Sequence, residues 1–152
     1  MAITYDNVFF DFCLDPLRDL FTSDFNYGKI YIAPEIKHKD SFSIRIWGLN
    51  AESEMYVASG WQKQYNIEIA LYEIETNPGE AFYKQFYNDS ERIYQLLFNN
   101  KSKSTTIGST THAWIDGVCE GFTINEFVGA EEEIEGLNVA KYVFNCKIIR
   151  ED

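Results

Sequence analysis

The spacing between apolar residues changes several times along this chain, and each change marks an expected element. In residues 5–21, apolar side chains recur every three or four positions, which predicts an amphipathic helix with one apolar stripe. Asp15 and Pro16 interrupt that stripe. The pattern therefore allows one kinked helix or two short ones, with Asp15 as the cap of the second and Pro16 in its first turn.

A second and stronger helical pattern covers residues 80–100. Its largest apolar side chains fall on one stripe that includes Phe86 and Ile93. Asp89 and Ser90 lie in the middle of this segment, and both residue types favour helix N-termini. The segment therefore predicts one long helix or two consecutive helices.

Alternation of apolar and polar residues predicts the strands. The segments that alternate, or that are rich in β-branched and aromatic residues, are 29–33, 42–48, 61–74, 111–127 and 138–150. Pro34 ends the first of them, and Gly117 and Gly121 predict bulges or bends within the fourth.

This order of elements predicts the fold class. Helix, three strands, helix and two strands describe a single α+β domain over residues 1–152, with an antiparallel (mixed) β-sheet and two helices packed on one face. Residues 48–60 and 101–109 have no regular period, so we expect loops there, the first as a long hairpin arm. Residues 129–136 are rich in glutamate and predict a charged hairpin tip.

The charge of the chain limits its partners. The formal net charge is −11 at pH 7, which disfavours binding to nucleic acid phosphates and to anionic membranes. An acidic surface can still keep DNA from adhering to a channel that it passes through. The first residues lack a basic region and no apolar run approaches the roughly 20 residues of a membrane span, so neither a signal peptide nor a membrane helix is expected.

Candidate chemistry is sparse. His38 and His112 lie in polar segments that we expect to be exposed, and neither has the spacing of a metal site. Cys13, Cys119 and Cys146 are odd in number and lack a CxxC pair, which disfavours a disulfide framework or a zinc site. No hydrolase or nucleotide-binding motif is present. We therefore predict no catalytic, cofactor-binding or metal-binding residues, and no enzymatic activity.

The three tryptophans lie near the ends of predicted strands. Trp47, Trp61 and Trp114 are expected to be buried anchors, as most tryptophans are. Trp61 follows the long unpatterned segment and is the best candidate for an exposed contact residue.

Taken together, the leading helix, the ribbon with its long arm, the packed second helix and the closing strand YVFNCKIIR resemble the tail terminator family of long-tailed bacteriophages and the related tail completion or neck proteins. The resemblance covers nearly the whole chain and depends on element order rather than on a short motif. It implies a homo-oligomeric ring, a hexamer in this family, at the head-proximal end of the tail. Such a ring ends the tail tube, joins it to the neck and surrounds a DNA channel lined by the β-layer.

The resemblance also implies partners and a location. The partners would be other copies of the chain, the tail tube protein, a neck or connector protein, and DNA that passes through the lumen without specific binding, with no cofactor and no membrane. The location would be the tail or neck of the virion, after assembly in the host cytoplasm.

Two groups of residues receive roles from this hypothesis. The arm, residues 49–60, would contact the tail tube or an adjacent subunit, and its candidate interface residues are Glu52, Glu54, Met55, Tyr56 and Trp61. The acidic residues expected to face the lumen or the solvent are Glu131, Glu132, Glu133 and Glu135.

Two alternatives fit the same sequence. One is a neck or head–tail connector protein of the same fold. The other, from a different class, is a small α+β ligand-binding or hydrolytic domain, whose apolar pocket the aromatic content would suit. The ring hypothesis predicts an assembly that depends on concentration, whereas the pocket hypothesis predicts a monomer or dimer.

Overall fold

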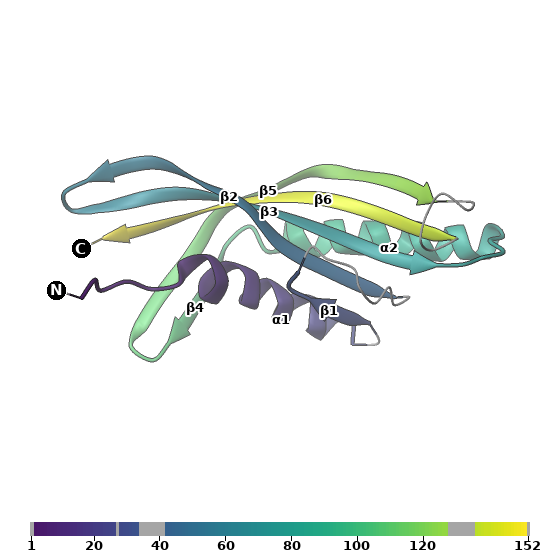
Figure 1. The fold of residues 1–152 in the computed structure, drawn as a ribbon, viewed down its shortest axis with the longest axis horizontal. Coiled ribbons are helices and arrows are strands. Elements are labelled where there is room, and N and C mark those ends of the chain that lie inside the picture. Colours follow the sequence, from purple (N-terminus) through teal and green to yellow (C-terminus); the bar gives the residue numbers. More distant parts are fainter. Residues whose placement is uncertain (1, 27, 34–41, 128–135, 152) are drawn as a thin grey trace.

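The structure, a computed structural model, describes residues 2–26, 28–33, 42–127 and 136–151. Within these residues a six-stranded mixed sheet carries both helices on one face (Figure 1), which confirms the expected α+β class. The strands lie side by side in the order β1-β2-β3-β6-β5-β4. Their bounds are Lys29–Tyr31 for β1, Ser43–Val57 for β2, Gly60–Ile74 for β3, Lys103–Ile107 for β4, Thr110–Phe127 for β5 and Leu137–Glu151 for β6.

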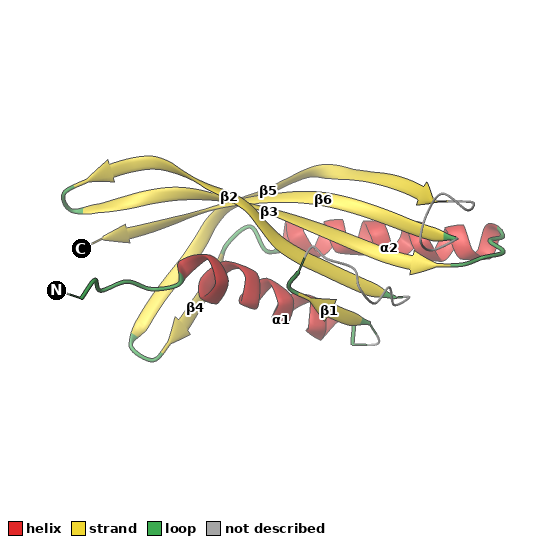
Figure 2. Ribbon diagram, in the orientation of Figure 1, coloured by secondary structure: helices red, strands yellow, loops and turns green. Residues whose placement is uncertain are grey.

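Most neighbouring strands are antiparallel. The single parallel pair joins β1 to the start of β2, and it ends at Tyr31 opposite Arg45. The centre of the sheet is the β3–β6 pair, which continues without a register shift from Gly60 opposite Glu151 to Ile74 opposite Leu137. This uninterrupted strand pair lies at the middle of the sheet and runs along the length of the molecule (Figure 2).

The N-terminal helix changes its winding where the sequence predicts an interruption. A π-helical turn at Phe10–Leu14, labelled η1, leads directly into α1 at Asp15–Asp24. Pro16 has no backbone N–H, so the regular hydrogen-bonding pattern cannot continue through it. Asp15 makes no side-chain cap and instead pairs with Arg18, so the predicted capping role is wrong.

The second helix, α2, is continuous from Glu80 to Asn99. Asp89 and Ser90 do not begin a new helix, because both lie buried against the sheet and bond within α2. The Ser90 hydroxyl donates to the Phe86 carbonyl oxygen at 2.8 Å, and Gln85 Nε2 donates to the Asp89 carboxyl group at 2.9 Å.

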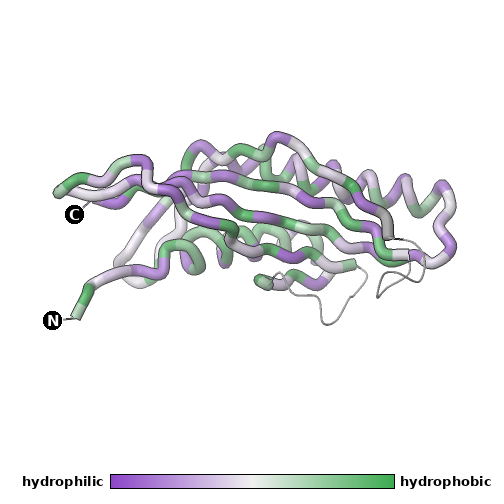
Figure 3. Tube along the Cα trace, turned by 45° about the horizontal axis from the view of Figure 1, so that its top comes forward, coloured by the Kyte–Doolittle hydropathy of each residue, from purple (hydrophilic) through white to green (hydrophobic). Residues whose placement is uncertain are grey.

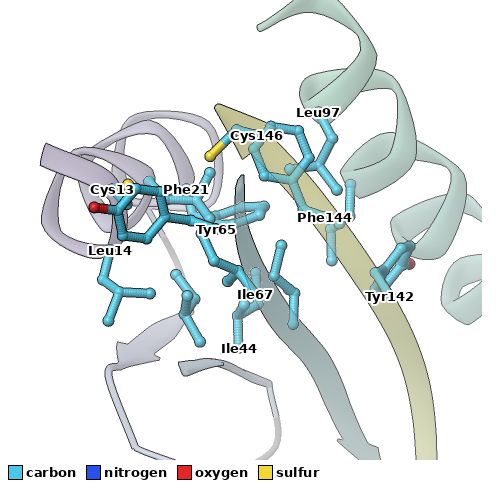
Figure 4. Close-up of a cluster of buried hydrophobic side chains, with 14 of the residues drawn as sticks. Cys13, Leu14, Phe21, Ile44, Tyr65, Ile67, Leu97, Tyr142, Phe144 and Cys146 are labelled. Carbon is cyan, nitrogen blue, oxygen red and sulfur yellow. The ribbon is translucent and has the colours of Figure 1, made fainter. Parts of the chain in front are cut away.

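One hydrophobic core fills the space between both helices and the sheet. Side chains from η1, α1, α2 and the central strands point toward one another (Figure 4). The alternation in β3 and β6 places one set of their side chains against the helices, where Tyr65, Ile67 and Ile69 as well as Tyr142 and Phe144 are all buried. Burial of aromatic and aliphatic side chains at this density is the main stabilising contribution to such a fold.

The fifth strand bends sharply, as its glycines predict. Its register with β6 shifts between Ile115 and Val118 and again between Cys119 and Phe122. At the first shift the Gly117 N–H donates to the Lys101 carbonyl oxygen at 2.8 Å, and a Cβ on Gly117 would collide with that oxygen and with the Phe144 ring. The bend carries the β4–β5 hairpin away from the plane of the sheet and toward the N-terminal helix (Figure 1).

Two segments expected to be loops are strands. β2 continues through residues 48–57, and residues 103–107 form β4, which pairs with β5 from Lys103 opposite Trp114. Both were missed because nearly all of their side chains are exposed, so neither face selects apolar residues. Backbone pairing to a neighbouring strand stabilises them instead.

Candidate assembly interface

The β2–β3 hairpin extends beyond the part of the sheet that the helices cover. In the structure the arm predicted at residues 49–60 includes its partner strand, and we keep the name for this wider range, residues 50–66. In Figure 1 the arm reaches past the first turn of the N-terminal helix. It pairs from Asn50 opposite Asn66 to Val57 opposite Gly60, and the last residues of β6 pair along its other side. Because three strands support it, the arm is an ordered projection and not a loop.

The arm ends in exposed apolar side chains. Met55, Tyr56 and Val57 are all exposed, Tyr56 by 86%. Figure 3 shows hydrophobic positions, in green, at the end of the β2–β3 hairpin. Trp61 lies directly across from Tyr56 and is half-buried. We call these four residues the arm tip.

The charged candidates on the arm are held within their own chain. Glu54 forms an ion pair with Lys147 of β6 at 3.1 Å, and Glu52 accepts a hydrogen bond from Asn50 at 3.5 Å. The ammonium group of Lys63 lies over the Trp61 ring, 4.3 Å from its centroid, which orients that ring by a cation–π contact. The sequence had no signal for the Glu54–Lys147 pair, since it joins residues far apart in the chain.

The sheet leaves long strand borders without a partner. β1 covers β2 only as far as Arg45, so from Ile46 to Val57 no strand of the described residues lies on the outer side of β2. On the opposite edge β4 covers β5 only as far as Trp114, and no described strand pairs with the outer side of β5 from Val118 to Phe127. Such borders present unpaired backbone donors and acceptors to other chains.

The face of the sheet without helices is rich in neutral amides. On the arm, Gln64 Nε2 donates to the Asn66 side chain at 3.0 Å, and Asn66 in turn donates to Asn50. These side chains alternate along β3 with the core residues, so they lie on the face opposite the helices. A smaller apolar cluster centred on Tyr72 and Val139 lies farther along the same face.

A polar cleft lies where the N-terminal segment meets the end of β6 and the β4–β5 hairpin. Asp6 is 3.3 Å from His112 Nε2 and 3.6 Å from Arg150, and the cleft around them encloses about 620 Å³. His112 also packs edge-on against Phe12, so its expected exposure is wrong. The His112 imidazole belongs to a polar segment, but the bend of β5 turns this side chain toward η1.

The other residues singled out in the sequence are either buried or half-buried, or lie outside the described residues. Trp114 is fully buried, as expected, and Trp47 is half-buried against the smaller apolar cluster. His38 and the four acidic residues Glu131, Glu132, Glu133 and Glu135 lie outside the described residues. All three cysteines are free thiols.

The described ranges contain neither a candidate metal site nor a candidate membrane-spanning helix. In those ranges, no three side chains among His, Cys, Asp and Glu come close enough together to hold a metal ion. Neither helix found there combines the length and the apolar character that crossing a membrane requires. No protein-family model matches the chain, and no curated protein matches its sequence.

Proposed function

We propose that this protein is a structural subunit that assembles into a ring at the head-proximal end of a phage tail, where it ends the tail tube and joins it to the neck. The observation that carries the proposal is the pair of uncovered strand borders on opposite edges of one sheet, Ile46–Val57 on β2 and Val118–Phe127 on β5.

Opposite edges favour a head-to-tail arrangement of copies. The β2 border of one copy and the β5 border of the next can extend a common sheet by backbone hydrogen bonding. An interface between two different surfaces repeats from copy to copy, and it forms a ring when the rotation per copy closes. A hexamer is the form that the family resemblance suggests.

The exposed face of the sheet suits a channel for DNA. Its arm carries neutral amide groups, its Lys147 is paired with Glu54, and the chain has a net charge of −11, so the face has little net attraction for DNA phosphates. A lumen of this kind lets the duplex pass with little retention. In this proposal the arm reaches an adjacent subunit or the tail tube, and the chain has no catalytic role.

The first experiment measures assembly and edge pairing together. Size-exclusion chromatography with light scattering over a range of concentrations should give a discrete oligomer, visible as a ring by negative-stain electron microscopy. Hydrogen exchange should then show protection in the oligomer, but not in the monomer, of the outward-pointing backbone amides of Ile46–Val57 and Val118–Phe127. These are about every second residue, because the other amides already bond to β3 or β6 within the chain.

The central strands are the matched control. Amides of β3, and of β6 as far as Lys147, have a paired strand of the same chain on both sides, so they should be protected in both states. A protein that is monomeric at every concentration would refute the ring. A ring whose two borders exchange as fast as in the monomer would refute edge pairing. Binding of the ring to the tail tube protein, and not only to a neck protein, would separate a terminator from a connector of the same fold.

A further inference from the structure

The part of β2 that lies in the arm breaks the alternation of its side chains once. Ser53 and Tyr56 both lie on the face that carries the helices, because their partners on β3, Lys63 and Trp61, alternate in step with the core residue Tyr65. The two β2 residues are nevertheless three positions apart along the chain. The reason is the bulge that follows Ser53, which adds one residue to β2 and none to β3.

The uncovered border of β5 has the same break. Cys119 and Phe122 lie on the helix-covered face, because they pair with Phe144 and Tyr142, which are both buried in the core (Figure 4). They too are three positions apart, since a bulge adds one residue to β5 between them. In a regular strand, side chains that share a face are separated by an even number of positions. The two borders therefore share an irregularity.

We propose that residues 50–57 of one copy pair with residues 118–125 of the next copy, so that Tyr56 stands opposite Cys119 and Ser53 opposite Phe122. This inference rests on the proposed ring and specifies the register of its interface. The pairing is antiparallel, because β2 and β5 run in opposite directions within one copy. Neighbouring copies in a similar orientation present the two borders to each other in that way.

This register superposes the two breaks. Between the two matched pairs, Glu54 and Met55 stand against Glu120 and Gly121, so the two strands have equal length there. On either side of the breaks, each pair lies on one face of the common sheet, which also places the outward-pointing backbone groups of the two strands opposite each other. A slip by two residues would set each bulge against a regular stretch, and a slip by one residue would mismatch the faces outside the bulges.

Features of the chain mark both ends of the proposed ladder. Just before Val118, the Gly117 N–H already donates to the Lys101 carbonyl oxygen at 2.8 Å, so it is engaged within its own copy. Beyond Asn50, a further bulge of β2 between Gly48 and Asn50 ends the agreement of faces. The ladder therefore occupies the part of each border that matches the other.

The register covers apolar side chains that are exposed in a single copy. Val57 is 52% exposed and stands opposite Val118, which is 48% exposed. Ile124 is 38% exposed and stands opposite Ala51. Apolar cross-strand pairs of this kind stabilise antiparallel sheets. No pair in the ladder places two charged side chains directly opposite each other, so the net charge of −11 does not oppose it locally.

The register also displaces each copy along the strands in a way that suits a closed ring. Within one copy, Asn50 and Val118 stand at the level of Asn145 of β6. In the proposed register Asn50 meets Asn125, which stands at the level of Val139, six residues from Asn145. The displacement is about 20 Å, and the strands β2, β3, β6 and β5 of each copy span about 19 Å. These two lengths tilt the strands by about 45° from the axis of a ring, as in closed β-barrels.

The experiment is cysteine cross-linking in the full chain. Val57→Cys and Val118→Cys are combined in one chain, because both side chains are exposed and the register places them opposite each other. Cys119→Ser is added to remove the partly exposed native thiol, since the other two are buried. Oxidation with copper phenanthroline should give a ladder of covalent oligomers on a non-reducing gel, which dithiothreitol returns to the monomer. An equimolar mixture of the two single variants, each with Cys119→Ser, should stop at the 1:1 dimer.

Two slipped pairs are the matched controls. Met55→Cys with Val118→Cys, and Val57→Cys with Glu120→Cys, also use exposed positions. Each differs from the proposed pair by two residues on one strand, which moves the two Cα atoms beyond the roughly 7 Å that a disulfide spans. Both controls should therefore cross-link at least about tenfold more slowly than the proposed pair. Under reducing conditions, all of these variants should unfold at the temperature of Cys119→Ser.

The outcomes separate the register from the ring. A slipped pair that cross-links as fast as Val57→Cys with Val118→Cys would overturn the register. The register is also wrong if that double variant assembles like the original protein by light scattering but forms no covalent ladder. If the original protein never assembles, the ring itself is wrong.

Discussion

The Glu73 side chain donates a hydrogen bond to Asp89 across the buried contact between β3 and α2. Both residues are almost fully buried, and the second oxygen of Glu73 has no hydrogen-bond partner among the described residues. Burial is the main cause that raises the pKa of Glu73, to about 8, and the hydrogen bond and charge of Asp89 add to it. The hydrogen bond between the sheet and the helix at this point therefore requires that Glu73 keep its proton.

Stability should consequently fall as the pH rises from about 4.5, the ordinary pKa of glutamate, to about 8. In this window the folded state retains a proton that the unfolded state has already released, so raising the pH favours unfolding. The expected loss is on the order of a few kcal/mol. Urea unfolding at a series of pH values, at a concentration where the protein is monomeric, measures it.

Glu73→Gln provides the control for this titration. The amide can still donate to Asp89 but does not titrate, so the stability lost by the original protein between these pH values should largely be retained. Equal pH slopes for the two proteins would show that the Glu73–Asp89 contact does not control this titration.

Trp114→Phe should destabilise the protein by about 1–3 kcal/mol through a lost hydrogen bond and a small cavity. The Trp114 indole N–H donates to the Asn100 carbonyl oxygen at 2.9 Å, which fixes the end of α2 against β5. Tyr142→Phe removes only a hydroxyl that donates to the Ser90 carbonyl oxygen at 2.7 Å, so it should cost about 1 kcal/mol. Denaturant midpoints measure both, and a larger effect of Tyr142→Phe would contradict this ranking.

Gly60→Ala should disturb the arm tip, where Gly60 pairs with Val57. Gly60 has a φ angle of +153°, and a Cβ there would lie 2.1 Å from the Arg150 carbonyl oxygen, so the end of β6 must move away at a cost of about 1–3 kcal/mol. Hydrogen exchange at Ile149–Glu151 should become faster. Gly108→Ala is the control, because its φ of +62° is also unfavourable but no atom lies within 4 Å of the new Cβ. Gly108→Ala should cost only about 1 kcal/mol and leave Ile149–Glu151 unchanged.

The three cysteines should react at very different rates with a thiol reagent. Cys13 and Cys146 are fully buried in the core (Figure 4). The hydrogen bond between these two thiols and their burial raise the pKa of Cys13. Cys119 is partly exposed, and burial raises its pKa as well, so it should react slowly. The native protein should therefore show one reactive thiol, absent in Cys119→Ser, and all three should react in urea. A reactive thiol that persists in native Cys119→Ser would contradict the burial of the other pair.

The amphipathic segments were predictable from the sequence by itself. The apolar stripe of residues 80–100 and the alternation in 61–74 and 138–150 identify α2, β3 and β6, because in each of them one face lies against the core. Gly117 and Gly121 indicated the bends of β5 because a glycine inside an alternating strand marks a bulge or bend, and the register of β5 shifts beside each of them. The α+β class follows from these elements and their order.

The arm, β4 and the surroundings of His112 were decided only by the tertiary structure. Residues 50–57 and 103–107 are strands because a neighbouring strand satisfies their backbone groups, while their exposed side chains are free to be polar. The position of the arm tip beyond the helices also depends on how the elements are arranged in space. Apolar periodicity records which residues face a core, and it contains no information about strands that project beyond the core or about which distant side chains meet.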